Sequence, residues 1–423
     1  MSTTDTRVPD VDAPAGGGAG DRPALSRCIA VPADRFAADI WGRRALLSPA
    51  AELGRGFDDL LTADAVDELL ADRALRTPFI RMAKEGTVLP QSAYTAPGGF
   101  GAEIADQVST DRVLAEFAAG ATIVLQGLHR TWQPLRDFSR QLILDLGHPV
   151  QINAYITPAQ SRGFDPHYDV HDVFVLQISG EKRWVVHEPV RDHPFADEPW
   201  SQHAAAVGAR AAEAPAIETV LRPGDALYLP SGWIHSAVAQ GGTTVHITVG
   251  MPAFTLADVG RDLIAAALRD DALREPLPIG VDIGDPRQLA DAVRRAADAL
   301  VAALSGEQDP SRAAEVLGRR LTRMSRPEPV RPLATVDAPA ALDPAARVRW
   351  RHGLRARVAV SAAEVAIGLG DRTVRLPLQT ADAITALEAG GGAAAGALPG
   401  LDEHDSLVVT RRLVREGVLL LDA

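Results

Sequence analysis

Two histidines and one aspartate carry the chemistry that this sequence suggests. His167 and Asp169 form an H-x-D pair just before an apolar run that ends at Gln177, and His235 follows in a Pro-Ser-Gly-Trp-Ile-His turn. Alternate residues of a strand share a face, so His167 and Asp169 can point to the same side. Two imidazoles and one carboxylate are the donor set that holds non-haem Fe(II) and leaves neighbouring positions open for oxygen chemistry. The pattern therefore predicts a ferrous centre.

Each part of this set also has an ordinary structural explanation. A lone histidine such as His235 is more often a buried core residue, and an H-x-D pair alone is a weak indication of a metal. His171 has the same strand parity as His167 and Asp169 and is a rival ligand. His246 is a less suitable third ligand, because it lies within a strand rather than in a turn. The linked pattern favours the metal site.

A ferrous centre with three open positions can hold a bidentate 2-oxo acid and O2. A second carboxylate on that acid would need a fixed cation inside the protein. Lys182 lies on the strand segment after the H-x-D pair and is the candidate cation, whereas Arg183 has the opposite parity and should face outward. A solvated hairpin lysine is the alternative, which local sequence alone favours.

Polar side chains on two further strands can reach the same interior. Asn153 and Tyr155 share parity on the strand before the metal motif, and Thr244, His246 and Thr248 alternate on the last strand of the barrel. A tyrosine within a strand is usually a core residue whose hydroxyl is satisfied nearby. We expect these residues to line a cavity beside the metal, with core packing as the alternative.

Short β-branched runs separated by Gly, Pro and Asp occupy the sequence between about 121 and 252, and they predict a jelly-roll barrel with the metal inside its mouth. One helix, at about 135–146, interrupts the series. The expected strands are 122–125, 150–156, 173–178, 184–186, 227–229 and 245–249.

The segments that flank the barrel differ from it in composition. Residues 1–27 are rich in Gly, Ala, Pro and Asp and predict a disordered leader, with structure beginning near Arg35. From there to about 120 the pattern is mostly helical, and Thr62 and Ser109 precede two expected helix starts. The barrel with these N-terminal helices is expected to span 28–252.

Three segments follow the barrel. Apolar residues recur at helical spacing within 253–326, and this stripe either packs on the same chain or forms a homodimer seam, at about even odds. A Pro-rich linker is expected at 327–344. In 345–423 we expect strands at 355–360, 364–369 and 373–376, helices at 381–389 and 406–415, and a final strand at 418–421, which resemble a winged-helix module.

Composition limits the classes of protein that fit. With one cysteine, Cys28, among 423 residues, an internal disulfide, a thiolate zinc site and an iron–sulfur cluster are excluded. The net charge of -12 argues against broad phosphate-backbone binding and favours a basic protein partner. No apolar run reaches the length of a membrane span, and residues near the N-terminus lack a signal-peptide core. A cytoplasmic location is the expectation.

Several linked motifs resemble the JmjC-type ribosomal oxygenases, which are cupin-like Fe(II)- and 2-oxoglutarate-dependent hydroxylases of ribosomal proteins. The resemblance extends over about residues 30–423. The motifs that carry it are Asn153 to Pro158, Pro166-His167-Tyr168-Asp169, Asp172 to Gln177, Gly180 with Lys182 and Trp184, and the run from Pro223 to His235.

The resemblance implies a fold, cofactors and site residues. The fold is α+β, a double-stranded β-helix followed by a helical dimerisation region and a C-terminal winged helix. The cofactors and co-substrates are Fe(II), 2-oxoglutarate and O2. By resemblance, His167, Asp169 and His235 are the iron ligands and Lys182 binds the 2-oxoglutarate carboxylate. The residues implied to line the co-substrate or substrate pocket are Asn153, Tyr155 and Thr244, where Thr244 stands at a position more often occupied by serine.

The resemblance also implies a reaction and leaves alternatives open. A lysine at position 182 leans towards hydroxylation of histidine in a ribosomal protein, with arginine next and demethylation of methyl-lysine chemically possible. A non-catalytic metal-binding cupin that acts as a protein-interaction module is the alternative function. DNA binding through the winged helix is disfavoured, because the helix at 381–389 has no Lys or Arg.

Overall fold

The packed chain begins earlier than the sequence suggested. The computed structural model describes residues 22–101, 103–159, 161, 165–306, 309–337 and 342–422. The predicted leader therefore lies outside the described residues as far as residue 21, but its last part was wrongly assigned. Helix α1 (Pro23–Ser26) buries Ala24 and Leu25, and the N–H groups of both residues donate to Asp145 Oδ2, at 2.8 and 2.9 Å. Structure is thus present well before Arg35.

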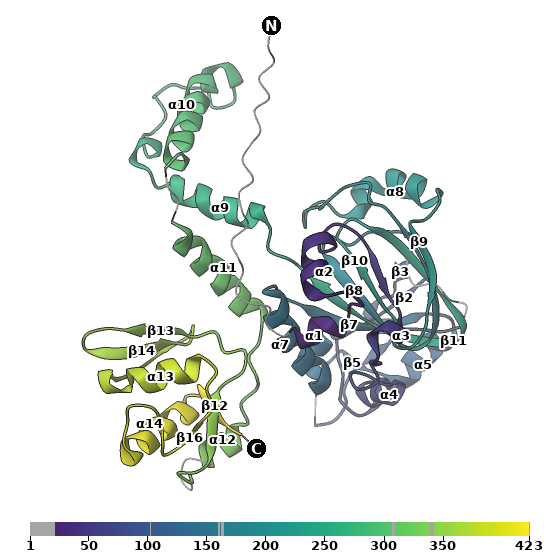
Figure 1. The fold of residues 1–423 in the computed structure, drawn as a ribbon. Coiled ribbons are helices and arrows are strands. Elements are labelled where there is room, and N and C mark those ends of the chain that lie inside the picture. Colours follow the sequence, from purple (N-terminus) through teal and green to yellow (C-terminus); the bar gives the residue numbers. More distant parts are fainter. Residues whose placement is uncertain are drawn as a thin grey trace.

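One antiparallel sheet of nine strands builds the first part of the described chain (Figure 1). Its strands follow the order β1-β10-β8-β11-β7-β6-β2-β3, and β9 pairs with β8 off this path. The bounds are β1 (Leu46–Ser48), β2 (Ile80–Lys84), β3 (Thr87–Val88), β6 (Thr122–Leu125), β7 (Gln151–Thr157), β8 (Asp172–His187), β9 (Ile217–Leu221), β10 (Ala226–Leu229) and β11 (Ile234–Met251). A separate pair comprises β4 (Thr95–Ala96) and β5 (Gln107–Val108).

The long strands β8 and β11 pair with each other over most of their lengths and position the site. The first part of β8 also pairs with β10, and its second part pairs with β9. Between the two parts, Gly180 has φ +65°, and a Cβ there would lie 2.4 Å from the carbonyl oxygen of Thr243. A glycine is therefore required where β8 changes partner. The runs expected at 173–178 and 184–186 are two parts of this one strand.

The expectation of a mostly helical segment before residue 120 was wrong for β1, β2 and β3, of which β1 and β2 pair with distant strands of this sheet. β1 pairs with β10, with Leu46 opposite Tyr228, and β2 pairs with β6, with Arg81 opposite Val124. Both strands are short, and their partners lie far away in the sequence. The α+β class and the antiparallel sheet are confirmed.

Helices cover the outside of this sheet and agree with several sequence predictions. Thr62 caps α4 by accepting a hydrogen bond from Ala65 N, and the helix expected at 135–146 is α7. None of the described helices combines the length and apolar character that a bilayer crossing requires. The bounds are α1 (Pro23–Ser26), α2 (Ala33–Asp39), α3 (Ala50–Leu53), α4 (Ala63–Ala71), α5 (Thr110–Ala118), α6 (Leu128–Thr131), α7 (Gln133–Leu146) and α8 (Ala204–Ala211).

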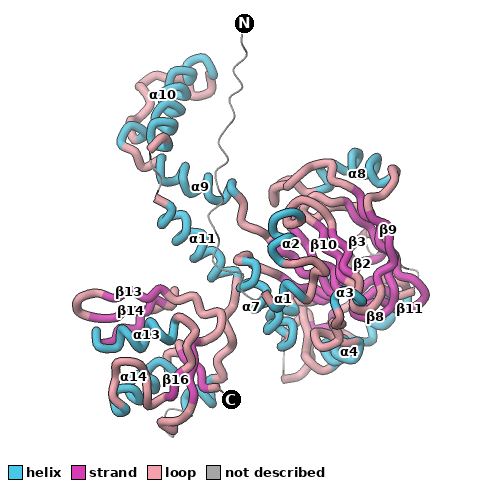
Figure 2. Tube along the Cα trace, in the orientation of Figure 1, coloured by secondary structure: helices cyan, strands magenta, loops and turns pink. Residues whose placement is uncertain are grey.

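Three helices follow the sheet and lie to one side of it in Figures 1 and 2, namely α9 (Leu256–Ala267), α10 (Pro286–Leu304) and α11 (Pro310–Met324). Asp258 links α9 to α11, because it receives a hydrogen bond from Arg320. Within the described chain no residue of α10 is buried, and Val293 and Val301 are 64% and 65% exposed. The predicted apolar stripe of α10 is thus covered only in part by the described residues: Leu289, Leu300 and Leu304 are half-buried, and Val293 is exposed.

The C-terminal part has its own core, formed by two small sheets and two helices. The predicted strands and helices of this part are confirmed, and β12 and β16 are additions, while the winged-helix assignment stays a prediction. The bounds are β12 (Arg347–Trp350), β13 (Arg357–Val360), β14 (Glu364–Gly368), β15 (Thr373–Pro377), α13 (Ala381–Glu388), β16 (Ala393–Ala394), α14 (Glu403–Arg415) and β17 (Leu419–Leu421).

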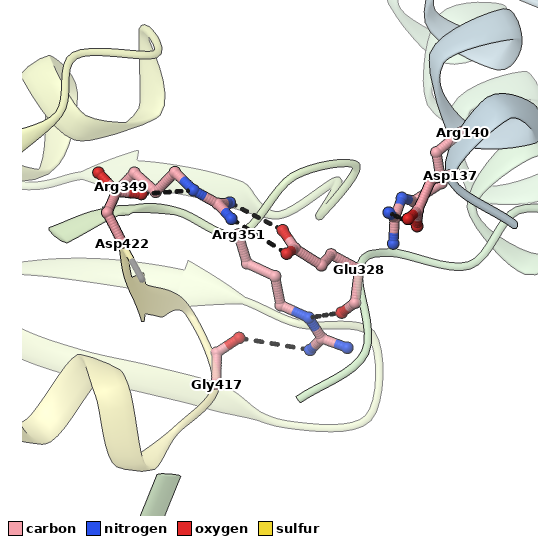
Figure 3. Close-up of polar contacts among 7 residues, drawn as sticks. All are labelled: Asp137, Arg140, Glu328, Arg349, Arg351, Gly417 and Asp422. Carbon is pink, nitrogen blue, oxygen red and sulfur yellow. Dashed lines mark hydrogen bonds and ion pairs between the residues drawn. The ribbon is translucent and has the colours of Figure 1, made fainter. Parts of the chain in front are cut away.

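The first residues of the predicted linker lie against this C-terminal part (Figure 3). Arg349 donates to both carboxylate oxygens of Glu328, at 2.7 and 3.0 Å, and to Asp422 at 2.8 Å. The Glu328 N–H donates to the carbonyl oxygen of His352. Hydrogen bonding from Arg349 lowers the pKa of Glu328. Further on, helix α12 (Pro332–Asp337) interrupts the segment, and residues 338–341 lie outside the described chain.

Candidate metal centre and its cavities

His167, Asp169 and His235 converge on one point at the mouth of the sheet. Their candidate ligand atoms all lie within 4.8 Å of one another. The Nε2 atom of His235 is 3.9 Å from Asp169 Oδ2, and the two imidazole centroids are 4.5 Å apart. Among the described residues this is the one group of at least three potential ligands with such spacing, and His171 does not belong to it.

The backbone holds this convergence in place without help from a metal. His167 and His235 form an isolated antiparallel bridge in which each N–H donates to the other residue's carbonyl oxygen, at 3.2 and 2.8 Å. Gly232 N donates to the carbonyl oxygen of Asp169 at 2.9 Å. Gly232 has φ +86°, and a Cβ there would lie 2.4 Å from the carbonyl oxygen of Arg191. The turn that delivers His235 therefore needs glycine at this position.

A buried aspartate, Asp172, fixes the same turn through hydrogen bonds. Asp172 accepts hydrogen bonds from the Tyr228 hydroxyl and from Ser231 N, the latter at 2.9 Å. The Tyr228 hydroxyl in turn accepts from Gly42 N at 2.8 Å. Burial raises the pKa of Asp172, and the two donors partly offset that effect. Asp172, the first residue of β8, thereby holds the turn that precedes His235 against the start of this strand.

The protonation states of the ligand group suit a divalent metal. The Nδ1 atoms of His167 and His235 lie 2.7 and 3.1 Å from the carbonyl oxygens of Asp165 and Trp233. This contact favours a proton on Nδ1 and leaves Nε2 as the donor to a metal. Burial lowers the pKa of His235 to about 4, so its imidazole is neutral. For Asp169, burial opposes ionisation, but the nearby histidines, His235 foremost, lower its pKa overall. Metal ligands require these states.

A cavity of about 240 Å³ extends inward from the ligand group and contains Lys182. Lys182 is 4% exposed, and its Nζ donates to Thr157 Oγ1 at 3.2 Å, while Thr157 and Thr122 lie 3.3 Å apart through their hydroxyls. Burial lowers the pKa of Lys182 to about 7, and no carboxylate of the described chain contributes to that shift. A buried ammonium without a carboxylate partner is a suitable site for the charged end of an anion. We call this space the inner cavity.

Three aromatic rings form a wall of the inner cavity. His246 stacks on Tyr155 with centroids 5.1 Å apart and planes 7° from parallel, and it meets Trp184 edge to face at 5.6 Å. Trp184 also stacks on His235 at 6.0 Å. Burial, with a contribution from Lys182, lowers the pKa of His246 well below its ordinary value, so this ring is neutral. The rings restrict the space around the metal ligands.

A second cavity of about 400 Å³, which we call the outer cavity, shares Asp169 with the inner cavity. Asn153 lines it and accepts a hydrogen bond from Gly127 N at 3.1 Å. Tyr155 lines both cavities, whereas Thr244 is among the lining residues of neither. Thr244 is fully buried and lies next to Gly180. Its expected role in a pocket therefore has no support from its position and stays a prediction.

Three residues in or beside the cavities were missed in the sequence. Arg81 on β2 lines both cavities and donates a hydrogen bond to the Tyr155 hydroxyl. Thr157 holds Lys182, and Trp200 lines the inner cavity with its ring 6.3 Å from that of His167. For Thr157 a signal existed, because it shares strand parity with Asn153 and Tyr155. Arg81 and Trp200 gave none, since each reaches the site from a segment not recognised as part of the barrel.

Comparison with known proteins finds a family that resembles the part of the chain that carries the site. Residues 129–259, which include all three ligands and Lys182, match the model of the JmjC domain. Ribosomal oxygenase 2 of Bos taurus is 34% identical over 172 residues, which are 40% of this chain and 35% of that protein. The bifunctional lysine-specific demethylase and histidyl-hydroxylase NO66 of Drosophila persimilis is 39% identical over 101 residues, 24% of this chain and 14% of that protein. The chain thus spans about a third or less of the length of these relatives.

Solved structures are less similar in sequence, but the similarity covers more of the chain. A crystal structure of the Escherichia coli ribosomal oxygenase YcfD superposes with a TM-score of 0.49 and 16% identity, covering 93% of this chain and 98% of that one. A structure of the same protein in complex with cobalt and 2-oxoglutarate has a TM-score of 0.48. The assignment rests instead on the JmjC match and the sequence relatives. Residues 129–259 thus match the JmjC domain, with its cupin-like fold, and part of the chain is related in sequence to the ribosomal oxygenases.

Proposed function

We propose that this protein is an Fe(II)- and 2-oxoglutarate-dependent oxygenase that hydroxylates a side chain of a ribosomal protein. The observation that carries the proposal is the presence of three metal-ligand side chains and a buried lysine in one 240 Å³ cavity. Relatives named as ribosomal oxygenases and histidyl-hydroxylases support it. With iron and 2-oxoglutarate bound, O2 would be consumed to give succinate, CO2 and one hydroxyl group on the target carbon.

The residues of the chain have separate tasks in this reaction. His167, Asp169 and His235 would hold the metal on one side and leave the other side open. Lys182 would pair with the distal carboxylate of 2-oxoglutarate and so fix the orientation of its 2-oxo acid end. The ring of Trp184, which lines the inner cavity, would exclude water from the space beside the metal. The target side chain would enter through the outer cavity, which meets the inner one at Asp169 and Tyr155.

The charge of the outer cavity favours a histidine target over an arginine. Arg81 and Arg130 line this cavity, and Asp169 is the one carboxylate among the described lining residues. If Asp169 binds the metal, a guanidinium target would meet two cations and no free carboxylate. His129 adds no positive charge near neutral pH, because burial lowers its pKa to about 4. A neutral imidazole suffers no such repulsion.

Mass spectrometry of a target exposed to the protein tests the reaction. The Fe(II)-loaded protein, 2-oxoglutarate and ribosomal proteins are mixed without oxygen and then exposed to O2. We expect succinate together with a target that is heavier by one oxygen atom, and neither product with His235→Ala. His404→Ala, an exposed histidine change on α14, is the matched control and should retain both products. Metal binding without succinate from any ribosomal protein would instead indicate a non-catalytic interaction module.

A pair of basic peptides that differ only in a central His or Arg tests the target class. We expect oxygen to be added to the histidine peptide at a rate at least tenfold above that of the arginine peptide. The reverse preference would refute the argument from the charges of the outer cavity.

We also infer that the protein is a homodimer that acts in the cytoplasm. Two exposed apolar residues of α10, Val293 and Val301, support an interface between two copies. The location follows from the ribosomal-protein target proposed above. Light scattering should give twice the chain mass, and Val293→Glu with Val301→Glu should give the single chain mass. A monomeric unmodified protein would contradict the dimer.

A further inference from the structure

An apolar groove of about 550 Å³ lies between α4 and α5, on the outer side of the sheet. Val66 and Leu70 line it from α4, and Val113, Leu114 and Phe117 line it from α5. Leu114 is 66% exposed, whereas its neighbours Val113 and Phe117 on α5 are buried and half-buried. The groove has the size of a ligand site and leaves a large apolar side chain in solvent.

The floor of this groove is the reverse side of the wall that lines the inner cavity. Ile156 and Val245 lie on the floor, and they alternate in β7 and β11 with Tyr155 and His246, which face the inner cavity. Successive side chains of a strand point to opposite faces. A partner held in the groove therefore lies one strand thickness from the proposed reaction site.

Unpaired carboxylates border the groove. Asp67 and Asp111 line it, and Asp64 precedes them on the first turn of α4. Among the described residues no lysine or arginine forms an ion pair with any of these three, whereas the nearby Glu68 is paired with Arg73. Asp64 and Asp111 lie in the first turns of α4 and α5, where a negative charge also stabilises the helix dipole. Asp67 lies beyond the first turn of α4, so its charge does not have this role. The border of the groove is therefore negative and accessible.

We propose that this groove docks a basic amphipathic helix of the target protein. This inference rests on the proposed function, because it assigns the helix to the protein that is hydroxylated. Apolar side chains at i, i+3 and i+4 of such a helix would fill the groove, and lysine or arginine side chains would reach Asp67 and Asp111. Helices α4 and α5 have nine residues each, so the groove is about 13 Å long and matches two to three turns.

Charge decides against the other occupants. Residues 1–21 of the same chain contain four aspartates and a single arginine, so this segment carries the sign of the groove border. A second copy of the chain has its proposed interface at α10, and its net charge of -12 does not complement the negative border of the groove. A basic ribosomal protein has the complementary sign.

Fluorescence anisotropy with a synthetic probe tests the proposal on the full chain. The probe is a labelled 15-residue peptide of leucine and lysine in helical repeat, and its partner peptide replaces every lysine with glutamate. We expect the lysine peptide to bind the wild-type protein and the glutamate peptide to bind at least tenfold more weakly. Equal binding of the two peptides would overturn the proposal.

Matched variants locate the binding. Leu114→Glu, and separately Asp67→Lys with Asp111→Lys, should each weaken binding of the lysine peptide at least tenfold. Val408→Glu on α14 changes a comparably exposed apolar residue, at 50%, and should leave binding unchanged. All these positions are exposed, so the thermal unfolding midpoint should stay constant and serve as a check of folding. Unchanged binding in both groove variants would overturn the proposal.

Two further measurements separate this inference from the proposed function. His235→Ala should bind the lysine peptide as the wild-type protein does, because the groove lies outside the ligand group. If the protein makes no succinate but Leu114→Glu still loses the peptide, the proposed reaction fails and the groove stands as a binding site. If Leu114→Glu instead lowers the mass of the peptide-free protein in light scattering, a second copy occupies the groove and the proposal is overturned.

Discussion

Replacing Lys182 with methionine is the sharpest test of how the inner cavity selects its ligand. The side chain is 4% exposed and has a hydroxyl, rather than a carboxylate, as hydrogen-bond partner. Removing one partner of a buried ion pair costs about 3–5 kcal/mol, so Lys182→Met should weaken 2-oxoglutarate binding by about 100- to 5,000-fold. The affinity for 2-oxopentanoate, which lacks the distal carboxylate, should change by less than about threefold.

The same substitution should stabilise the ligand-free protein. Burial lowers the pKa of Lys182 to about 7, below its unfolded value near 10.4. The unfolded chain therefore holds the proton between these values, and the folded lysine form gains stability as pH rises from about 7 to about 10. Relative to the wild-type protein, Lys182→Met should gain most at or below pH 7, by up to about 4 kcal/mol, and this gain should vanish towards pH 10.

Calorimetric titration with Mn(II) in place of Fe(II) measures the affinities, and urea unfolding at several pH values measures the stabilities. Arg183→Met is the matched control, because Arg183 is adjacent, 45% exposed and paired with Glu218 on the outer face. It should alter neither quantity by more than about 1 kcal/mol. An equal loss of affinity for both oxo acids in Lys182→Met, or the same effects in Arg183→Met, would refute the assignment of Lys182 to the distal carboxylate.

Three further substitutions test the support around the ligand group. Gly232→Ala should lower the free energy of unfolding by more than about 2 kcal/mol and weaken Co(II) binding. The reason is that φ of Gly232 is +86° and a carbonyl oxygen would lie 2.4 Å from the new Cβ. Gly241→Ala, which has open space around its Cβ, is the control and should leave Co(II) binding intact. Tyr228→Phe removes a hydroxyl donor from a buried carboxylate and should cost about 1–3 kcal/mol in urea unfolding, with unchanged stability contradicting the hydrogen bond. Arg81→Met frees the Tyr155 hydroxyl at the junction of the cavities and should raise the ratio of succinate to hydroxylated target at least threefold; an unchanged ratio would show that Arg81 does not position the target.

Local patterns in the sequence were sufficient for the ligand group. His167 and Asp169 share parity within one short segment, and the turn before His235 has a proline and a glycine at fixed places, so their geometry depends on few distant contacts. Most barrel strands and the helix α7 were likewise predictable, because hydrophobic periodicity and punctuation are local signals. Lys182 was placed by parity, but its burial depends on Thr157 from another strand.

What could not be predicted depends on pairing between distant segments. β1 becomes a strand because β10 lies beside it, and β2 because β6 does. Neither segment is long enough to show a period of its own, and β-propensity depends strongly on neighbours. Arg81 was missed for the same reason, since its contact with the site exists only once β2 has joined the sheet. The start of the packed chain was misjudged because Ala24 and Leu25 are held by Asp145, from a helix far along the sequence.

The bidentate contact between Glu328 and Arg349 determines where the C-terminal part can be separated from the rest. A fragment cut at the predicted boundary, residue 345, would lose Glu328 and leave two donors of Arg349 without an acceptor. A fragment that begins at Arg326 keeps the contact and the hydrogen bond from Glu328 N to the carbonyl oxygen of His352. Protease-resistant fragments should therefore start before Glu328. The C-terminal part should fold independently only as the longer fragment that begins at Arg326.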